Sequence, residues 1–339
     1  MQKVYTIDLS MLVELDKEEI YDLLKEKLHL PDYCGTNLDA LYDALTEMGE
    51  CDINIIDCKN DDNTSSCNDS SESSKAIEAG SKYSYVDKIK KVFEDASELN
   101  PDINLHIITG RYLSKYISLY DYEYQKGRHY LNASRRSPDR LVYTKSIDDF
   151  KNMLPDAVSC FVIIDNGLYD EPRLLLSREY RYPTGQFLLS VPAGLIDPDD
   201  AKSTYDSSSS SCKGNDENDI KSYSNMTPAM KAAVREIKEE TGIELTDKDI
   251  IKTVNPLVFS TPGMTDESNA LVSVIIRSDI EGQLSQDGAE GSELFDGFEL
   301  LTKEKAREIL KKGVDDNGIF YSVYTCIALM YYVSDLWME

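Results

Sequence analysis

The sequence has few of the residues that mark secreted, membrane-spanning or nucleic-acid-binding proteins. Its seven cysteines form no CxxC pair and no small disulfide framework, and their odd number favours a reducing compartment. Lys and Arg number 36 against 62 Asp and Glu, which gives a net charge of −26. Phosphate backbones are bound by cationic side chains, so this deficit argues against broad nucleic-acid binding. We therefore expect a cytoplasmic protein whose partners are basic proteins or metal ions.

Long apolar runs are also missing. The longest, YSVYTCIALMYYVSDLWM at 321–338, is too short and too rich in tyrosine to span a bilayer, so we expect a packing helix and no membrane partner. Large aliphatic residues are nearly absent from residues 57–80 and 201–227, which are rich in Ser, Asn and Asp. Such segments bury too little surface to offset the entropy of ordering, so we predict two disordered inserts.

The remaining sequence divides into two regions. Residues 1–109 alternate short strands with amphipathic helices, which predicts an α/β domain. This region is the more acidic per residue, with a net charge of −14 over residues 1–110. Residues 110–339 begin with a hairpin that turns at Gln125-Lys126-Gly127 and continue with strands and helices in mixed order. We expect a second, α+β domain there.

Three glutamates lie close together in AVREIKEETG, residues 233–242. On a helix, Glu236 and Glu240 share one face, with Glu239 beside them, and like charges at this spacing repel. Divalent cations can hold such a cluster, because Mg²⁺ takes carboxylate oxygens as ligands. Arg235 precedes Glu239 by four residues and can pair with it. The structural alternative is a solvated charged helix with no ligand.

When residues 201–227 are left out, a longer pattern emerges. Gly194 is followed by five residues, the acid Asp200, seven residues and then R-E-I-K-E-E-T-G-I. This resembles the Nudix box, although Asp200 is one methylene shorter than the family's Glu, and the insert separates the glycine loop from its helix. The resemblance implies a hydrolase that uses Mg²⁺, with Mn²⁺ as the alternative. The metal ligands it implies are Glu236, Glu240, Glu239 and the backbone carbonyl of Ala193.

One branch of that family matches further segments. Residues 176–197, 260–272 and 129–136 resemble the ADP-ribose and ADP-sugar pyrophosphatases. In that branch the N-terminal segment lines an adenosine pocket across a dimer, which implies a homodimer through this domain. The catalytic residues implied are Arg235, Glu239 and a general base on a later loop, with Glu293 as first candidate and Glu290 as second. The substrate contacts implied are Arg181, Arg135, Tyr130, Tyr116 and Gly263.

The first region has a resemblance of its own. LPDYCGTNLDALYDAL at 30–45, with the flanking helices, resembles barstar, the intracellular inhibitor of a secreted ribonuclease. The resemblance implies that Tyr33, Asp39, Asp43 and Asp95 bind a basic ribonuclease. Asp39 and Asp43 share a helical face and can present paired negative charge to arginines. The structural alternative is a helix capped by Asn37 whose acids are merely solvated.

Together these resemblances predict a three-layer, barstar-like α/β domain with a small parallel sheet, followed by an α+β Nudix fold with a mixed sheet sandwiched by helices. The expected activity is Mg²⁺-dependent hydrolysis of the pyrophosphate in ADP-ribose or a related nucleoside diphosphate sugar, which gives AMP and a sugar phosphate. The alternative is a ribonuclease-binding protein whose Nudix domain is catalytically weak.

Overall fold

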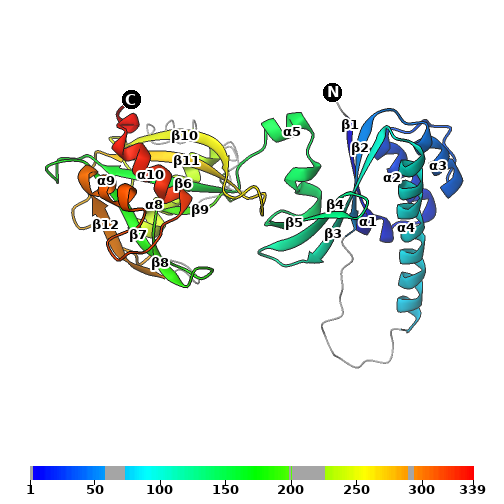
Figure 1. The fold of residues 1–339 in the computed structure, drawn as a ribbon, viewed down its shortest axis with the longest axis horizontal. Helices are drawn as coiled ribbons and strands as arrows, with labels where there is room; N and C mark the ends of the chain where they lie inside the picture. Colours follow the sequence, from blue (N-terminus) through cyan, green and yellow to red (C-terminus); the bar gives the residue numbers. More distant parts are fainter. Residues whose placement is uncertain (1–2, 58–72, 198–199, 201–225, 289–293) are drawn as a thin grey trace, which may run out of the picture. The chain divides into compact units, whose positions relative to one another are not determined.

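Two compact units make up the chain (Figure 1). The computed structural model describes residues 3–57, 73–197, 200, 226–288 and 294–339, with the side chains of residues 73–84 left out. The first unit comprises Met1–Met153 and Thr261–Asp266, and the second comprises Leu154–Ser260 and Glu267–Glu339. Each unit has its own sheet.

The sheet of the first unit has five strands in the order β1-β2-β3-β4-β5. The first three are parallel, and the last two add an antiparallel hairpin. Both faces of β2 are covered, since Ile55 packs in one core and Ile56 in another. Parallel strands need crossover connections, which the helices supply. The strands are β1 (Lys3–Asp8), β2 (Cys51–Asp57), β3 (Ile103–Tyr112), β4 (Ser118–Gln125) and β5 (Arg128–Ser134).

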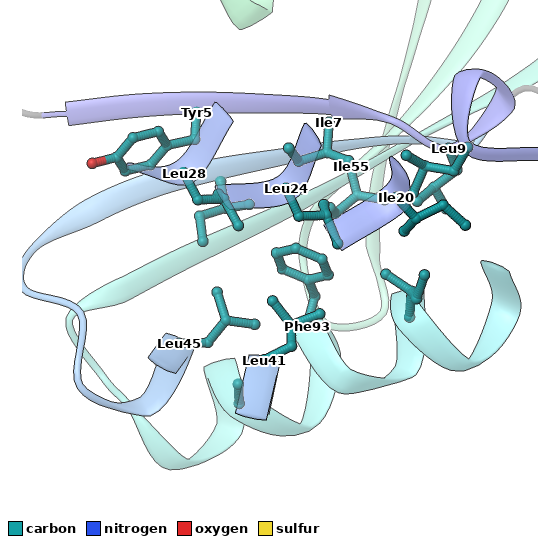
Figure 2. Packing of buried hydrophobic residues seen from close by; sticks show 14 of the residues in the cluster. Tyr5, Ile7, Leu9, Ile20, Leu24, Leu28, Leu41, Leu45, Ile55 and Phe93 are labelled. Carbon is teal, nitrogen blue, oxygen red and sulfur yellow. The ribbon is translucent and has the colours of Figure 1, made fainter. Parts of the chain in front are cut away.

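Four helices build the main core of this unit: α1 (Leu9–Val13), α2 (Lys17–Leu28), α3 (Leu38–Thr46) and α4 (Ser73–Leu99). Asn37 caps α3, since its side chain accepts a hydrogen bond from the backbone N–H of Ala40 at 2.8 Å. Figure 2 shows Phe93 of α4 beside Leu41 of α3. Both side chains are buried, and burying each stabilises the fold by about 1.5–3 kcal/mol.

The hairpin turns at the residues predicted, with Gly127 in the left-handed region at φ 72°. It pairs with β3, however, and the predicted boundary between residues 109 and 110 falls inside that strand. A strand edge left unpaired exposes backbone donors and acceptors, and β4 satisfies those of β3. The predicted insert at 57–80 is also shorter in the structure, because Asp57 ends β2 and residues 73–80 belong to α4. The rest of that insert lies outside the described residues.

The sheet of the second unit has seven strands. Its main path is β10-β11-β6-β7-β12, with β8 paired to β7 and β9 paired to β6. All eight residues of β6 are buried, as expected of a central strand covered on both faces. The strands are β6 (Ala157–Ile164), β7 (Arg173–Arg181), β8 (Gln186–Ser190), β9 (Ala193–Leu195), β10 (Ile250–Phe259), β11 (Ser268–Ile276) and β12 (Phe295–Leu301).

Helices cover this sheet on both faces, as predicted. Alternate residues of β6 face opposite ways: Cys160 packs with helix α8 (Pro228–Thr241), while Phe161 packs with α9 (Lys303–Lys312) and α10 (Val323–Val333). Helix α10 contributes Ala328, Leu329 and Tyr332 to the core that contains Phe161. This is the packing role expected of the C-terminal apolar run. Among the helices that the structure describes, none could span a membrane.

Candidate active site and candidate protein-binding surface

Helix α8 carries the glutamate cluster against the sheet of the second unit. The helix begins after Thr227, whose side chain caps Met230 N–H at 3.3 Å, and ends at Gly242, which adopts φ 75°. The side of the helix that faces the core carries Glu236 and Glu240, which are only 8% and 5% exposed. Two carboxylates so deeply buried need nearby donors or cations.

Strand β9 supplies one donor and the necessary space. The backbone N–H of Ala193 donates to Glu240 Oε1 at 3.2 Å. A Cβ atom on Gly194 would overlap the carboxylate of Glu236, so any larger residue here would have to displace that carboxylate. The structure therefore brings the glycine loop and the helix of the predicted box into direct contact, although the insert separates them in sequence.

Arg235 is the cation of this cluster. Its Nη1 donates to Glu236 Oε1 at 2.7 Å and to Glu239 Oε2 at 3.2 Å. Its Nη2 donates to the carbonyl of Leu195 at 2.8 Å and lies 3.4 Å from Asp200 Oδ2. Burial lowers the pKa of Arg235, but the carboxylates of Glu236, Asp200 and Glu239 outweigh it, so the net pKa lies above the ordinary value. The shorter Asp200 thus still reaches the box arginine.

The donor chemistry of this cluster fits a hard divalent cation. Carboxylate oxygens and the Ala193 carbonyl are the ligand types that Mg²⁺ prefers, and substrate phosphates commonly complete its shell. Within the described residues, no three His, Cys, Asp or Glu side chains are grouped closely enough to hold a metal ion by themselves. Glu239 is turned toward solvent and pairs with Arg235, whereas Glu236 and Glu240 are buried. The residues fit a site that needs oxygen ligands from substrate or water.

A loop that the sequence alone did not connect to the box packs against the end of α8. The backbone N–H of Ser285 donates to the carbonyl of Thr241 at 3.0 Å. A Cβ atom on Gly288 would overlap the carbonyl of Glu239, so this glycine is also required for close approach. Both proposed bases, Glu293 and Glu290, lie outside the described residues. The chain therefore passes beside Glu239 immediately before it reaches them.

Of the predicted substrate contacts, only Arg181 lies in the second unit. It is partly exposed in β7 and pairs with Glu179 at 2.5 Å. The others belong to the first unit. Tyr130 donates its hydroxyl to the carbonyl of Gly263 at 2.6 Å, and Arg135 and Tyr116 are exposed. The structure thus joins Tyr130 to Gly263, two residues far apart in sequence.

The residues predicted to bind a ribonuclease lie on the surface of the first unit. Tyr33 is 86% exposed, and Asp39 and Asp43 project from α3. Tyr33 and Asp43 line a groove of ≈730 Å³, together with Glu47 and Glu50. Asp95 is on α4 and pairs with Lys91 on the same helix at 2.8 Å. An acidic rim of this kind suits a cationic partner.

Comparisons with known proteins find relatives of two kinds. Residues 2–101 match the sequence profile described as "Barstar (barnase inhibitor)". A Bacillus subtilis protein, YrdF, whose name assigns it to the ribonuclease inhibitors, is 46% identical over 39 residues, which cover 12% of this chain and 43% of its own.

Two further relatives carry Nudix names. A Caenorhabditis elegans protein named as nudix hydrolase 2 is 32% identical over 135 residues, covering 39% of this chain and 45% of its own length. An uncharacterized Nudix hydrolase of Schizosaccharomyces pombe is 26% identical over 162 residues, covering 47% and 63%. The matches thus span roughly half of these relatives.

A solved structure titled "Crystal structure of ADP compounds hydrolase" aligns with 68% of this chain and 91% of its own, at a TM-score of 0.38 and 16% identity. The sequence matches carry the assignment: the chain has a barstar domain at its N-terminus, followed by a region with distant homology to the Nudix hydrolases.

Proposed function

We propose that the second unit hydrolyses the pyrophosphate bond of ADP-ribose or a related nucleoside diphosphate sugar, giving AMP and a sugar phosphate. The observation that carries this proposal is the pair of buried carboxylates, Glu236 and Glu240, held against the backbone of β9 at Gly194. A core with no ligand gains nothing from two buried acids on one helix face, since burying a charge is costly unless it is compensated.

The residues of this chain divide the work as follows. Glu236 and Glu240 would hold Mg²⁺, together with the carbonyl of Ala193, and Mn²⁺ would suit the same oxygen ligands. When bound, the ion polarises the phosphate oxygens and neutralises their charge. Arg235 orients Glu236 and Glu239 through the hydrogen bonds that its Nη1 donates to both carboxylates. A loop carboxylate would accept a proton from the water that attacks phosphorus, with Glu293 as the first candidate and Glu290 as the second.

A substrate screen tests this proposal. The full chain is incubated with Mg²⁺ and with ADP-ribose, ADP-sugars and other nucleoside diphosphate sugars, and the released phosphate monoester is measured. We expect release from at least one adenine substrate and none from Glu236→Gln. Comparing Glu293→Gln with Glu290→Gln identifies the base. A folded wild-type protein that releases no phosphate monoester from any of these compounds would contradict the proposal and favour a catalytically weak Nudix domain.

A second function is favoured by a separate observation. The barstar domain exposes Tyr33, Asp39 and Asp43 beside an acidic groove, and we infer that it binds a basic ribonuclease there. Charge complementarity of this kind speeds association and makes it sensitive to salt. Inhibition of a barnase-type ribonuclease by the full chain, measured at low and at high salt, tests the inference. The absence of inhibition at micromolar protein would remove it.

A further inference from the structure

The hairpin region has the opposite charge to the rest of the chain. Residues 110–140 contain seven Lys or Arg and three Asp or Glu, whereas the whole protein carries −26. This basic segment includes the end of β3, both hairpin strands and the turn between them. This segment, taken as a whole, therefore favours an anion more than the rest of the chain does.

Within this segment, one buried carboxylate fixes two cationic side chains. Asp121 of β4 is 6% exposed. Its Oδ2 accepts from Arg111 Nε at 3.0 Å and from Nη2 at 2.5 Å, and its Oδ1 lies 2.9 Å from His129 Nδ1. Arg111 and His129 come from the strands on either side of β4. The three strands thus place a guanidinium and an imidazole around a single acid.

The outer edges of both cations face solvent. The side chains of Arg111 and His129 are 55% and 46% exposed. In the described part of the chain, no residue hydrogen-bonds to Arg111 Nη1 or to His129 Nε2. Arg111 lies where the pairing of β3 with β4 shifts register, between Gly110 and Tyr112, and such bulges redirect side chains. The inner edges are fixed, and the outer edges are free to bind.

Protonation of His129 decides the charge of this cluster. Asp121 is ionised, because hydrogen bonds from Arg111 and His129 outweigh its burial and lower its pKa. An ionised carboxylate only accepts, so His129 Nδ1 carries a hydrogen and Nε2 either binds a proton or stays a lone pair. The other nearby acid is Glu123, the cross-strand partner of His129, whose carboxylate accepts from Gly127 N–H at 2.6 Å. Lys126 of the turn pairs with Glu98 of α4.

We propose that Arg111 and protonated His129 form a binding site for a doubly charged phosphate group, either free or at the end of a phosphate ester. The guanidinium and the imidazolium each donate one hydrogen bond to the phosphate oxygens, while Asp121 holds both donors in place. When His129 is neutral, the cluster has no net charge and Nε2 repels an anion. Binding is therefore coupled to proton uptake by the imidazole, and affinity is higher in mildly acidic than in mildly basic solution.

The test uses the histidine resonances of the full chain, which has three histidines. Sulfate is the first probe, because it keeps its double charge at every pH used in the experiment. We expect saturable movement of the His129 ring resonance at about pH 6 and binding roughly tenfold weaker at about pH 8. Inorganic phosphate and AMP, with adenosine as the uncharged control, then separate free phosphate from an ester.

Two variants make the result decisive. Arg111→Gln keeps an amide donor but loses the charge, and should weaken sulfate binding at least about tenfold. His129→Gln should remove the pH dependence. Both side chains are about half exposed, and a cooperative thermal transition well above the assay temperature verifies that each variant is folded. The proposal is overturned if sulfate and phosphate do not move the His129 resonance saturably, or if Arg111→Gln binds as wild type does. The cluster would then only fasten the hairpin to β3.

Discussion

Helices α3 and α8 both carry two acids four residues apart, yet the two pairs have opposite surroundings. Asp39 and Asp43 of α3 are exposed, and among the described residues neither carboxylate forms an ion pair or a hydrogen bond. Glu236 and Glu240 of α8 are buried and lie against Arg235 and the β9 backbone. The same spacing therefore gives a surface in one unit and an interior cluster in the other.

The difference shows what each pair is suited to. Exposed acids cost little to keep charged, and they attract a distant cationic partner through a long-range field that salt screens within about 10 Å at 0.1 M. Buried acids are costly unless cations or donors lie close by, which makes them suited to a tightly held ion. These surroundings support the proposals that α3 binds a protein and α8 binds a metal ion, and the following changes test whether the two roles are separate.

The largest effect is expected for Glu240→Gln. The amide keeps the shape but not the charge, so it binds Mg²⁺ poorly, and hydrolysis should fall by about a thousandfold or more, equivalent to about 4 kcal/mol in the barrier. The matched control is Glu239→Gln on the solvent side of the same helix, which should lose less. Turnover close to wild type in folded Glu240→Gln would show that the buried acid is not a metal ligand.

Asp43→Ala should weaken ribonuclease binding by about 2–5 kcal/mol, because it leaves a cation of the partner buried without its counter-charge. This magnitude is borrowed from barnase–barstar, where such pairs have been measured. The control is Asp95→Ala, since Asp95 already pairs with Lys91 and should lose less. Competition binding at two salt concentrations measures both variants. Equal affinity of Asp43→Ala and wild type would mean that the α3 acids are only solvated.

Gly194→Ala should destabilise the second unit by about 1–3 kcal/mol, because the added methyl displaces the Glu236 carboxylate. Hydrolysis should decline with it. Gly49→Ala in the first unit is the control, since nothing lies within 4 Å of the position its Cβ would take. Chemical denaturation gives both free energies of unfolding. If Gly194→Ala has the same free energy of unfolding as the wild type and keeps full activity, the close contact between β9 and α8 is needed for neither stability nor hydrolysis.

The smallest effect is expected from deleting residues 201–225. Their composition cannot build a core, and without them the glycine loop and α8 become nearly contiguous in sequence. Activity should stay within about tenfold of wild type, which corresponds to about 1.4 kcal/mol in the barrier. The assay is steady-state hydrolysis at saturating Mg²⁺. A folded deletion variant without any activity would place part of the site in the insert.

Local patterns in the sequence were sufficient to predict most helices and strands and the type of each domain. The helix at α8, the Asn37 cap of α3 and the hairpin turn all follow from residues within one or two turns of each other. The pairing of β3 with β4 could not be predicted in this way. It depends on which strand edge the hairpin meets, and periodicity contains no information about that choice.

The candidate active site of the second unit was also predictable only in part. The box placed Gly194 and the glutamates in one pattern, and the structure shows their contact. The Leu195 carbonyl and Gly288 were missed, because their roles come from backbone atoms that approach α8 from distant segments. The Arg111–Asp121–His129 cluster was missed for a related reason. Its members lie on three strands, and no spacing along the chain indicates that they meet.

The central claim is that the buried acids of α8, and not the exposed acids of α3, hold the divalent cation. Calorimetric titration of Mg²⁺ into the wild type, Glu240→Gln and Asp43→Asn tests it directly, since both variants remove one negative charge from an acid pair of the same spacing. We predict that Asp43→Asn binds Mg²⁺ as the wild type does, and that Glu240→Gln loses the binding. Equal Mg²⁺ binding by Glu240→Gln and wild type, or loss of binding in Asp43→Asn, would contradict the account.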